Sequence, residues 1–163
     1  MIQCRHSKGK GYKTMKTTLI RFYNAHAYTH NYILGFRMNK KIYFVTVDAK
    51  ELDFVTKLDK ASRGAGYSLR FKPNRTQKNY LMSLGAEVLC SEEMFDELKK
   101  MSKYNFGELF EKLITEMNGQ EWVKDNVPFT EDGDLTVDGV AYQLKFEKAT
   151  FITEAQMMRM ERA

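Results

Sequence analysis

Residues 134–146, with the sequence DLTVDGVAYQLKF, contain the dipeptide that most narrowly limits how this chain can fold. Asp138 and Gly139 are the pair preferred at the centre of a two-residue type I′ turn, because both positions need a positive φ. A hairpin built on that turn places Asp134 opposite Gln143. Since side chains alternate across a sheet, one face of the hairpin is expected to carry Asp134, Thr136, Ala141, Gln143 and Lys145.

The polar face of this hairpin combines groups that suit a metal ion. Directly opposed cross-strand residues have Cβ atoms about 4.5–5.5 Å apart, so Asp134 and Gln143 could bind one cation together. Magnesium (Mg2+) prefers oxygen ligands such as a carboxylate and an amide, and Mn2+ can substitute for it. Lys145 projects from the same face, where an ammonium group can orient a water molecule or stabilise charge developing on phosphorus. The hairpin therefore predicts a magnesium site suited to phosphodiester hydrolysis.

The segment 106–117 is the clearest helix in the sequence. Its apolar residues recur with helical spacing and form one stripe, made of Phe106, Leu109, Phe110, Leu113, Ile114 and Met117. Asn118 and Gly119 are typical of a helix end. Glu111 lies beside the stripe, so it would supply a further carboxylate if this helix packs on the hairpin.

The rest of the chain alternates between predicted strands and helices, which indicates an α/β fold. Strands are expected at residues 17–23, 32–36, 41–47, 67–71, 86–90 and 122–129. Helices are expected at residues 49–60, 76–84, 91–101 and 153–162. We divide the chain into a flexible basic N-terminus (1–16), a basic α/β part that extends the core (17–104) and a core (105–163).

The net charge of +5 conceals an asymmetry. Residues 1–90 contain 17 Lys+Arg and 5 Asp+Glu, or 17 − 5 = +12, whereas residues 91–163 contain 9 and 16, or 9 − 16 = −7. A basic half is typical of polyanion binding. The residues expected to contact phosphates are Arg63, Arg70, Lys72, Arg75 and Lys78. The alternative is an ordinary solvated basic face.

Three short motifs follow one another in the C-terminal third. They are Gly107-Glu108-Leu109-Phe110-Glu111, then Gly133-Asp134, then Gln143-Leu144-Lys145. In this order, with the helix first and the hairpin between Asp134 and the lysine, residues 105–163 resemble the PD-(D/E)XK nuclease superfamily. They are most similar to the branch, found among type IV restriction endonuclease catalytic domains, that has Gly-x-x-Phe-Glu on the first helix and Gln-x-Lys in the active-site strand.

The resemblance implies a role for each matching residue. Asp134 would be the principal metal ligand, and Gln143 takes the place usually held by a glutamate. Lys145 matches the lysine of the family, and Glu111 matches the helix glutamate that supports the metal or its water. Taken singly, each of these residues is more often an ordinary turn, strand or surface residue. Only their shared face and order unite them.

The resemblance also implies a restriction-endonuclease-like core, in which a mixed sheet is flanked by helices. The backbone carbonyl of Leu144 would be a further metal ligand, and Gln156 would contact DNA or the edge of the site. The expected activity is magnesium-dependent hydrolysis of DNA phosphodiester bonds by an endonuclease. A homodimer would suit double-strand cleavage, and RNA is an alternative substrate.

Two departures from the family pattern leave a second reading open. The neutral Gln143 removes one negative charge from the metal site, so a catalytically inert DNA-binding or inhibitory protein on the same fold is the alternative. The family's sheet also usually continues into another strand after the last helix, whereas this sequence ends at residue 163. Residues 86–90 could substitute for that strand, or the chain could be a permuted version.

The sequence predicts neither a membrane protein nor a secreted one. No apolar run approaches the ~18–20 residues needed to span a bilayer. The only thiols, Cys4 and Cys90, lie far apart and lack metal-ligand spacing, which is typical of a reducing compartment. We therefore expect a cytoplasmic protein, and the resemblance implies a prokaryotic or phage-type setting.

Overall fold

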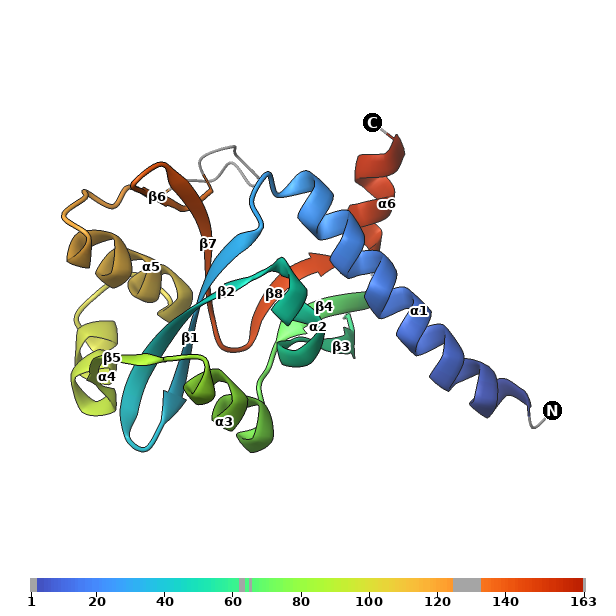
Figure 1. The fold of residues 1–163 in the computed structure, drawn as a ribbon, viewed down its shortest axis with the longest axis horizontal. Coiled ribbons are helices and arrows are strands. Elements are labelled where there is room, and N and C mark those ends of the chain that lie inside the picture. The colour runs from blue at the N-terminus through green and yellow to red at the C-terminus, as the bar shows by residue number, and fades with distance from the viewer. Residues whose placement is uncertain (1–2, 62–63, 65, 125–132, 163) are drawn as a thin grey trace.

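The fold is α/β, with two β-sheets and with helices on both sides of the larger one (Figure 1). It is seen in a computed structural model that describes residues 3–61, 64, 66–124 and 133–162. Side chains are described from residue 11 onward, except at residue 12. None of the helices in this described part is both long enough and apolar enough to cross a membrane.

The larger sheet has the strand order β5-β2-β1-β7-β6 and the smaller has the order β3-β4-β8. β1 and β7 run parallel, while the other paired strands run antiparallel, so the larger sheet is mixed, as predicted. In chain order the strands are β1 (Asn31–Met38), β2 (Lys41–Asp48), β3 (Lys57–Lys60), β4 (Tyr67–Phe71), β5 (Glu87–Ser91), β6 (Leu135–Val137), β7 (Val140–Phe146) and β8 (Ala149–Thr153).

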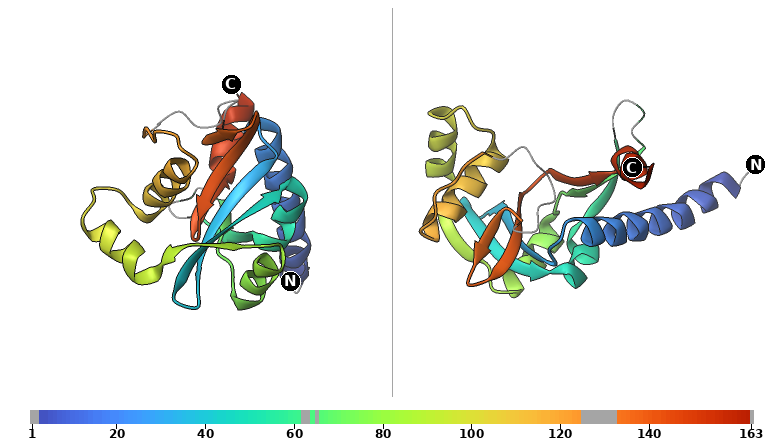
Figure 2. Two further views of the ribbon diagram at one scale, coloured as in Figure 1. Left: turned by 60° about the vertical axis from the view of Figure 1, so that its left-hand side comes forward. Right: turned by 90° about the horizontal axis from the view of Figure 1, so that it is seen from above.

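Helices cover the larger sheet unequally. α4 and α5 lie on one side of it, whereas α1 and the smaller sheet lie on the other (Figure 1, Figure 2). The helices are α1 (Gln3–His26), α2 (Leu52–Val55, after a 3-10 turn at Ala49–Glu51), α3 (Arg75–Ser83), α4 (Glu92–Lys100), α5 (Phe106–Met117) and α6 (Glu154–Arg162). Both sheets combine strands from residues 17–104 with strands from residues 105–163, and the boundary at residue 105 stays a prediction.

Strand β1 separates two hydrophobic cores because its side chains alternate across the sheet. Tyr32, Leu34 and Phe36 are fully buried in the core between the larger sheet, α1 and the smaller sheet. Ile33 packs in the second core, beneath α4 and α5. Gly35 faces that second core as well, directly under the ring of Phe110. The packing of α5 on the sheet therefore depends on a missing side chain at this position.

Replacing Gly35 tests this packing. A Cβ at Gly35 would lie 2.2 Å from Cε1 of Phe110, a fully buried residue. We expect Gly35→Ala to lower the free energy of unfolding by about 1–3 kcal/mol, because the ring cannot move without disturbing α5. Gly11→Ala in α1 is the control, since a Cβ there meets nothing within 4 Å. Urea denaturation measures both variants, and an unchanged Gly35→Ala would contradict the described packing.

The strand predicted at residues 17–23 is wrong, because this segment belongs to α1. Leu19, Tyr23 and Ala27 are fully buried, whereas Arg21 and Ala25 between them are exposed, so burial recurs every four residues and not every two, as on a helix and not a strand. Residues 3–16, for which we expected a flexible segment, form the first part of the same helix. The β-branched and aromatic residues at 17–23 favoured a strand locally, but the packing of the buried stripe favours the helix.

The helix predicted at residues 49–60 is correct only in its first half. It ends at Val55, and Lys57–Lys60 forms β3, which pairs with β4. Strand β8 was not predicted, although it joins β4 on its other side. Of the strand predicted at residues 122–129, residues 122–124 have no regular structure and the remainder lies outside the described residues.

The parallel neighbour of β7 is β1, not the segment at residues 86–90 that we considered for that place. β1 pairs with β7 in a register that aligns Ile33 with Leu144. The segment at residues 86–90 largely forms β5, which pairs with β2 at the far edge of the sheet. β7 is thus an interior strand, with β1 on one side and the short β6 on the other.

Candidate active site

The predicted hairpin forms with the predicted register. Leu135 pairs with Tyr142, and Val137 pairs with Val140. The turn between them has φ of 51° at Asp138 and 79° at Gly139, as a type I′ turn requires. The antiparallel ladder of β6 and β7 thus begins at Leu135.

Asp134 lies just before this ladder and does not pair with Gln143 as we expected. Its backbone N–H donates to the carbonyl of Tyr142 at 2.8 Å. Its carboxylate Oδ2 accepts a hydrogen bond from the backbone N–H of Leu144 at 2.9 Å. The chain therefore turns so that the carboxylate lies against the edge of β7 instead of above its face.

Gly133 makes this close approach of the chain to β7 feasible. Its φ is 61°, a conformation that glycine adopts without steric cost. A Cβ at this position would lie 2.6 Å from the backbone oxygen of Tyr142. The Gly133-Asp134 pair of the sequence motif therefore has a structural basis, because any other residue at 133 would push Asp134 away from the strand.

The edge of β7 beyond Tyr142 is where the candidate site lies. Because β6 starts at Leu135, no strand among the described residues covers Leu144 on this side. A residue's N–H and C=O point to the same edge of a strand, so the Leu144 carbonyl lies on the edge that the Asp134 carboxylate approaches. This arrangement fits the expected backbone ligand at Leu144.

Gln143 and Lys145 project from β7 toward α1 and β8, on the side opposite to α5. Gln143 is only 5% exposed, and its Oε1 accepts a hydrogen bond from the hydroxyl of Tyr23 at 3.3 Å. Lys145 donates to the carbonyl of Thr150 at 3.2 Å, and its Nζ lies 5.5 Å from the ring centre of Phe151. Each side chain thus contacts an aromatic residue, Tyr23 or Phe151.

Burial near these two aromatic residues shifts the pKa values of the site. The rings of Tyr23 and Phe151 meet edge to face with centroids 5.2 Å apart. Burial lowers the pKa of Lys145, and the negative charges of Asp134 and Glu111 oppose that shift. Burial also raises the pKa of Tyr23, with smaller contributions from Tyr32 and Asp134. Lys145 is therefore a cation that loses its proton more readily than an exposed lysine.

Glu111 reaches the same region from helix α5. Its pKa is raised to about 8, mainly by burial and next by the nearby charge of Asp134. The charge of Lys145 and a hydrogen bond with Trp122 act in the opposite direction. Asp134, Glu111 and Lys145 therefore lie within electrostatic reach of one another, although they come from a loop, a helix and a strand.

The raised pKa of Glu111 makes the stability of the metal-free protein depend on pH. The folded pKa of about 8 exceeds the ordinary 4.5, so only the folded protein holds this proton between these values. Stability is then lost as pH rises through this window, by on the order of 2 kcal/mol between pH 6 and pH 9. Glu111→Gln should remove this loss because the amide stays neutral.

Urea denaturation at several pH values in EDTA tests this expectation. The control is Glu116→Gln on the same helix, whose carboxylate forms an exposed ion pair with Lys112 at 2.9 Å. The control should retain the slope of the wild-type protein. Parallel pH profiles for the wild type and Glu111→Gln would contradict the burial of Glu111 near Asp134.

The donor atoms suit magnesium in type. Asp134 and Glu111 supply carboxylates, Gln143 an amide oxygen and Leu144 a backbone carbonyl, and hard cations prefer oxygen ligands. No group of three or more His, Cys, Asp or Glu placed to hold a metal occurs among the described residues. The pKa of Glu111 is raised mainly by burial and next by the charge of Asp134, so both effects disfavour two ionised carboxylates here without added positive charge. A divalent cation completed by water would supply that charge, so the residues fit the ion.

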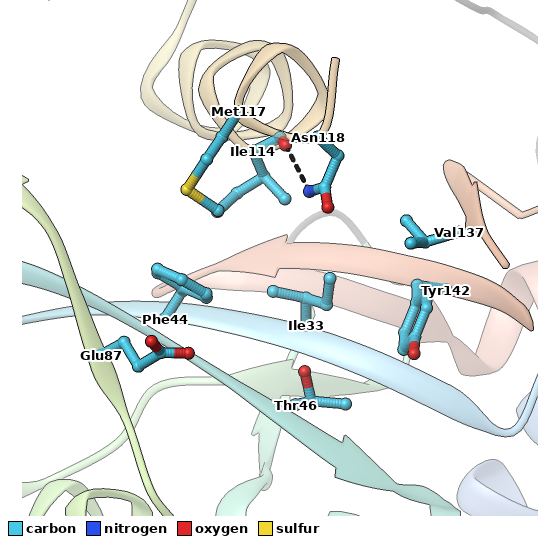
Figure 3. Close-up of a pocket in the computed structure, with 9 residues that line it drawn as sticks. All are labelled: Ile33, Phe44, Thr46, Glu87, Ile114, Met117, Asn118, Val137 and Tyr142. Atoms are coloured by element: carbon cyan, nitrogen blue, oxygen red, sulfur yellow. Dashed lines mark hydrogen bonds between the residues drawn. The ribbon is translucent and has the colours of Figure 1, made fainter. Parts of the chain in front are cut away.

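Two hollows adjoin the hairpin. The first, with a volume of about 390 Å³, is open and includes Asp134 in its lining with Gln120, Gly133, Leu135 and Thr136. The second, of about 330 Å³, lies between the end of α5 and the larger sheet, and its lining is mostly apolar (Figure 3). Only the first contains one of the four candidate residues in its lining, so it is the better candidate for substrate access.

Most residues expected to contact phosphates are engaged within the molecule. Arg70 and Lys72 both lie near the carboxylate of Asp59, at 3.5 and 2.8 Å. Lys78 lies 3.1 Å from Glu147. These three cations are therefore engaged in ion pairs, although Arg70 and Lys72 share one carboxylate.

The other three residues expected to contact nucleic acid, Arg63, Arg75 and Gln156, lie in different environments. Arg75 is exposed on α3, whereas Arg63 lies outside the described residues. Gln156 forms a capping box with Thr153 at the start of α6, donating its N–H to the hydroxyl at 3.0 Å and accepting the Thr153 N–H at 3.4 Å. A capping role explains Gln156 without any contact to DNA.

Sequence reasoning missed two residues that contact the site. Tyr23 holds Gln143, and Trp122 hydrogen-bonds Glu111. Tyr23 was hidden because we assigned its segment to a strand, although the charged Arg21 midway between Leu19 and Tyr23 argued against a strand that buries both. No comparable signal identified Trp122.

Compared with known proteins, the chain matches no family model, no curated protein and no solved structure.

Proposed function

We propose that this protein is a magnesium-dependent endonuclease that hydrolyses DNA phosphodiester bonds with a site resembling that of the PD-(D/E)XK superfamily. The observation that carries the proposal is the mutual electrostatic interaction of Asp134, Glu111 and Lys145, with the Asp134 carboxylate held at the edge of β7 by the Leu144 N–H. Two carboxylates that interact beside a half-buried amine suit hydrolysis of an anionic ester better than they suit structural stabilisation, because each carboxylate raises the cost of ionising the other.

Each residue has a separate part in this proposal. Asp134, Glu111, Gln143 and the Leu144 carbonyl would hold the cation, which when bound polarises the phosphate and acidifies water. The Leu144 N–H fixes the direction of the Asp134 carboxylate. Lys145, anchored by the Thr150 carbonyl, orients the attacking water or stabilises charge on the phosphate oxygens.

Strand order supports a permuted version of the family core. In the superfamily the sheet usually continues into a further strand after the helix that follows the lysine strand. Here α1 and β1 precede the other elements, and β1 runs parallel to β7. We infer that β1, beside β7, occupies the position of that further strand of the family sheet.

The proposal is tested by incubating supercoiled plasmid with the protein in Mg2+, Mn2+ or EDTA. Nicked or linear products should form with either cation and not in EDTA. A parallel incubation with structured RNA separates a DNA enzyme from an RNA enzyme. Absence of cleavage in all metal conditions would overturn the proposed activity.

The environment of Gln143 favours one alternative, a catalytically inert DNA-binding or inhibitory protein. Its amide is buried, neutral and already hydrogen-bonded to Tyr23, as in a purely structural contact. A metal ligand at this position would more commonly be charged. Calorimetric titration with Mg2+ and Mn2+ distinguishes the two functions, because an inert protein would release no binding heat with either ion.

A further inference from the structure

We infer that the exposed face of helix α1 is a docking surface for the phosphate backbone of duplex DNA. The inference deepens the proposed function, since it rests on DNA being the polyanion, but it concerns binding and not cleavage. The surface is the α1 face, defined as Lys13, Thr14, Thr17, Thr18 and Arg21. None of the phosphate contacts expected from the sequence lies on it.

The charge of α1 has one sign throughout. No Asp or Glu occurs before Asp48, and α1 itself contains 6 Lys+Arg. Like-charged residues along one helix repel one another unless a partner of opposite charge compensates them. Among the α1 cations whose side chains the structure describes, the body of the protein supplies such a partner only to Lys16, which lies 3.7 Å from Asp53.

The α1 face contains the groups that usually contact DNA phosphates. Lys13, Thr17 and Arg21 recur every four residues and are exposed, so they form one row along the helix. Among the described residues neither cation of this row has an ion-pair partner. A shallow hollow of about 290 Å³ follows the face, and two cations and three threonines line it. Lysine, arginine and hydroxyl side chains make most protein contacts to phosphate.

The position of α1 leaves this face accessible. Its apolar side, which includes Leu19 and Tyr23, is buried against the body. The N-terminal part of the helix projects away from both sheets (Figure 1, Figure 2). A helix of 24 residues is about 36 Å long, so the projecting part can extend along a groove or a backbone beyond the body.

The same observations disfavour a membrane surface as the partner. Helices that lie in a membrane interface expose a broad apolar face to the lipid. From Met15 onward the apolar side of α1 packs into the core of its own protein, and the α1 face has no large apolar side chain. Duplex DNA therefore matches the chemistry of the surface better.

The test compares two variants that each remove two positive charges from the full-length protein. Lys13→Gln/Arg21→Gln alters the α1 face, and Lys50→Gln/Lys100→Gln removes lysines that are 79% and 73% exposed elsewhere. Affinity for a fluorescent DNA duplex is measured by anisotropy in EDTA across a salt series. The α1 variant should bind about tenfold more weakly, and its salt slope should fall by about 2, whereas the control should bind nearly as the wild type does.

Three results would overturn the inference. One is wild-type affinity in the α1 variant, and another is an equal loss in the control, which would indicate net charge alone. The third is found when the DNA is replaced by another ligand: the α1 variant binds DNA normally but loses affinity for phosphatidylserine vesicles or for duplex RNA. Because DNA binding is measured without a metal ion, its result can be interpreted even if the plasmid assay shows no nuclease activity.

Discussion

Asp134→Asn is expected to reduce magnesium-dependent cleavage by about a thousandfold. The amide oxygen can still accept the Leu144 N–H, so the edge of β7 and the hairpin should keep their geometry. What disappears is the negative charge that would hold the cation and that now raises the pKa of Glu111. The pKa of Glu111 should therefore fall in this variant. Single-turnover cleavage of plasmid DNA measures the loss.

The matched control for this variant is Asp138→Asn at the tip of the same hairpin. It makes the same chemical change, and asparagine is equally suited to the positive φ of 51° at this position. Cleavage by the control should stay within about twofold of the wild type. If Asp134→Asn cleaves DNA as fast as this control, Asp134 has no part in the chemistry.

Lys145→Met is expected to reduce cleavage by about a hundred- to a thousandfold while leaving magnesium binding intact. Methionine keeps an unbranched apolar chain over the Phe151 ring but removes the amine that contacts the Thr150 carbonyl. A cation beside the bound ion opposes metal binding, so calorimetry should show equal or tighter binding. Loss of rate without loss of metal distinguishes a role in the chemistry from a role in binding.

Lys112→Met is the control for the lysine variant. Lys112 lies next to Glu111 on α5, but its amine pairs with Glu116 at the surface. Its removal should change cleavage less than about twofold, as expected for an exposed pair. The lysine hypothesis fails if both variants lose activity equally, or if Lys145→Met loses its cooperative unfolding transition.

Local sequence signals predicted those parts of the molecule that local chemistry determines. The Asp138-Gly139 turn fixed the register of β6 and β7, because few other dipeptides accept two successive positive φ values. The stripe from Phe106 to Met117 predicted α5 from end to end.

Features that depend on distant packing were not predicted. Whether residues 17–23 form a strand or a helix is decided by the buried stripe of Leu19, Tyr23 and Ala27, which needs both sheets to be in place. The parallel partner of β7 is a strand more than a hundred residues earlier in the chain, which no local pattern reveals. The ion pairs of Arg70 and Lys72 with Asp59 likewise arise only when β3 and β4 pair.

The candidate site shows the same division. Gln143 and Lys145 were placed on one face correctly because the strand period is two residues. Asp134 was placed opposite Gln143, but the ladder ends one residue earlier and the carboxylate meets the N–H of Leu144. The sequence identified Glu111 as a candidate, whereas its burial depends on how α5 packs.

The most direct test of the account is a crystal soaked in manganese and measured at a wavelength where the ion scatters anomalously. The account predicts one strong anomalous peak at the edge of β7, about 2.0–2.3 Å from carboxylate oxygens of Asp134 and Glu111. The same peak should be absent from crystals of Asp134→Asn. A well-diffracting crystal with no peak there, or with the ion bound by other residues, would contradict the central claim.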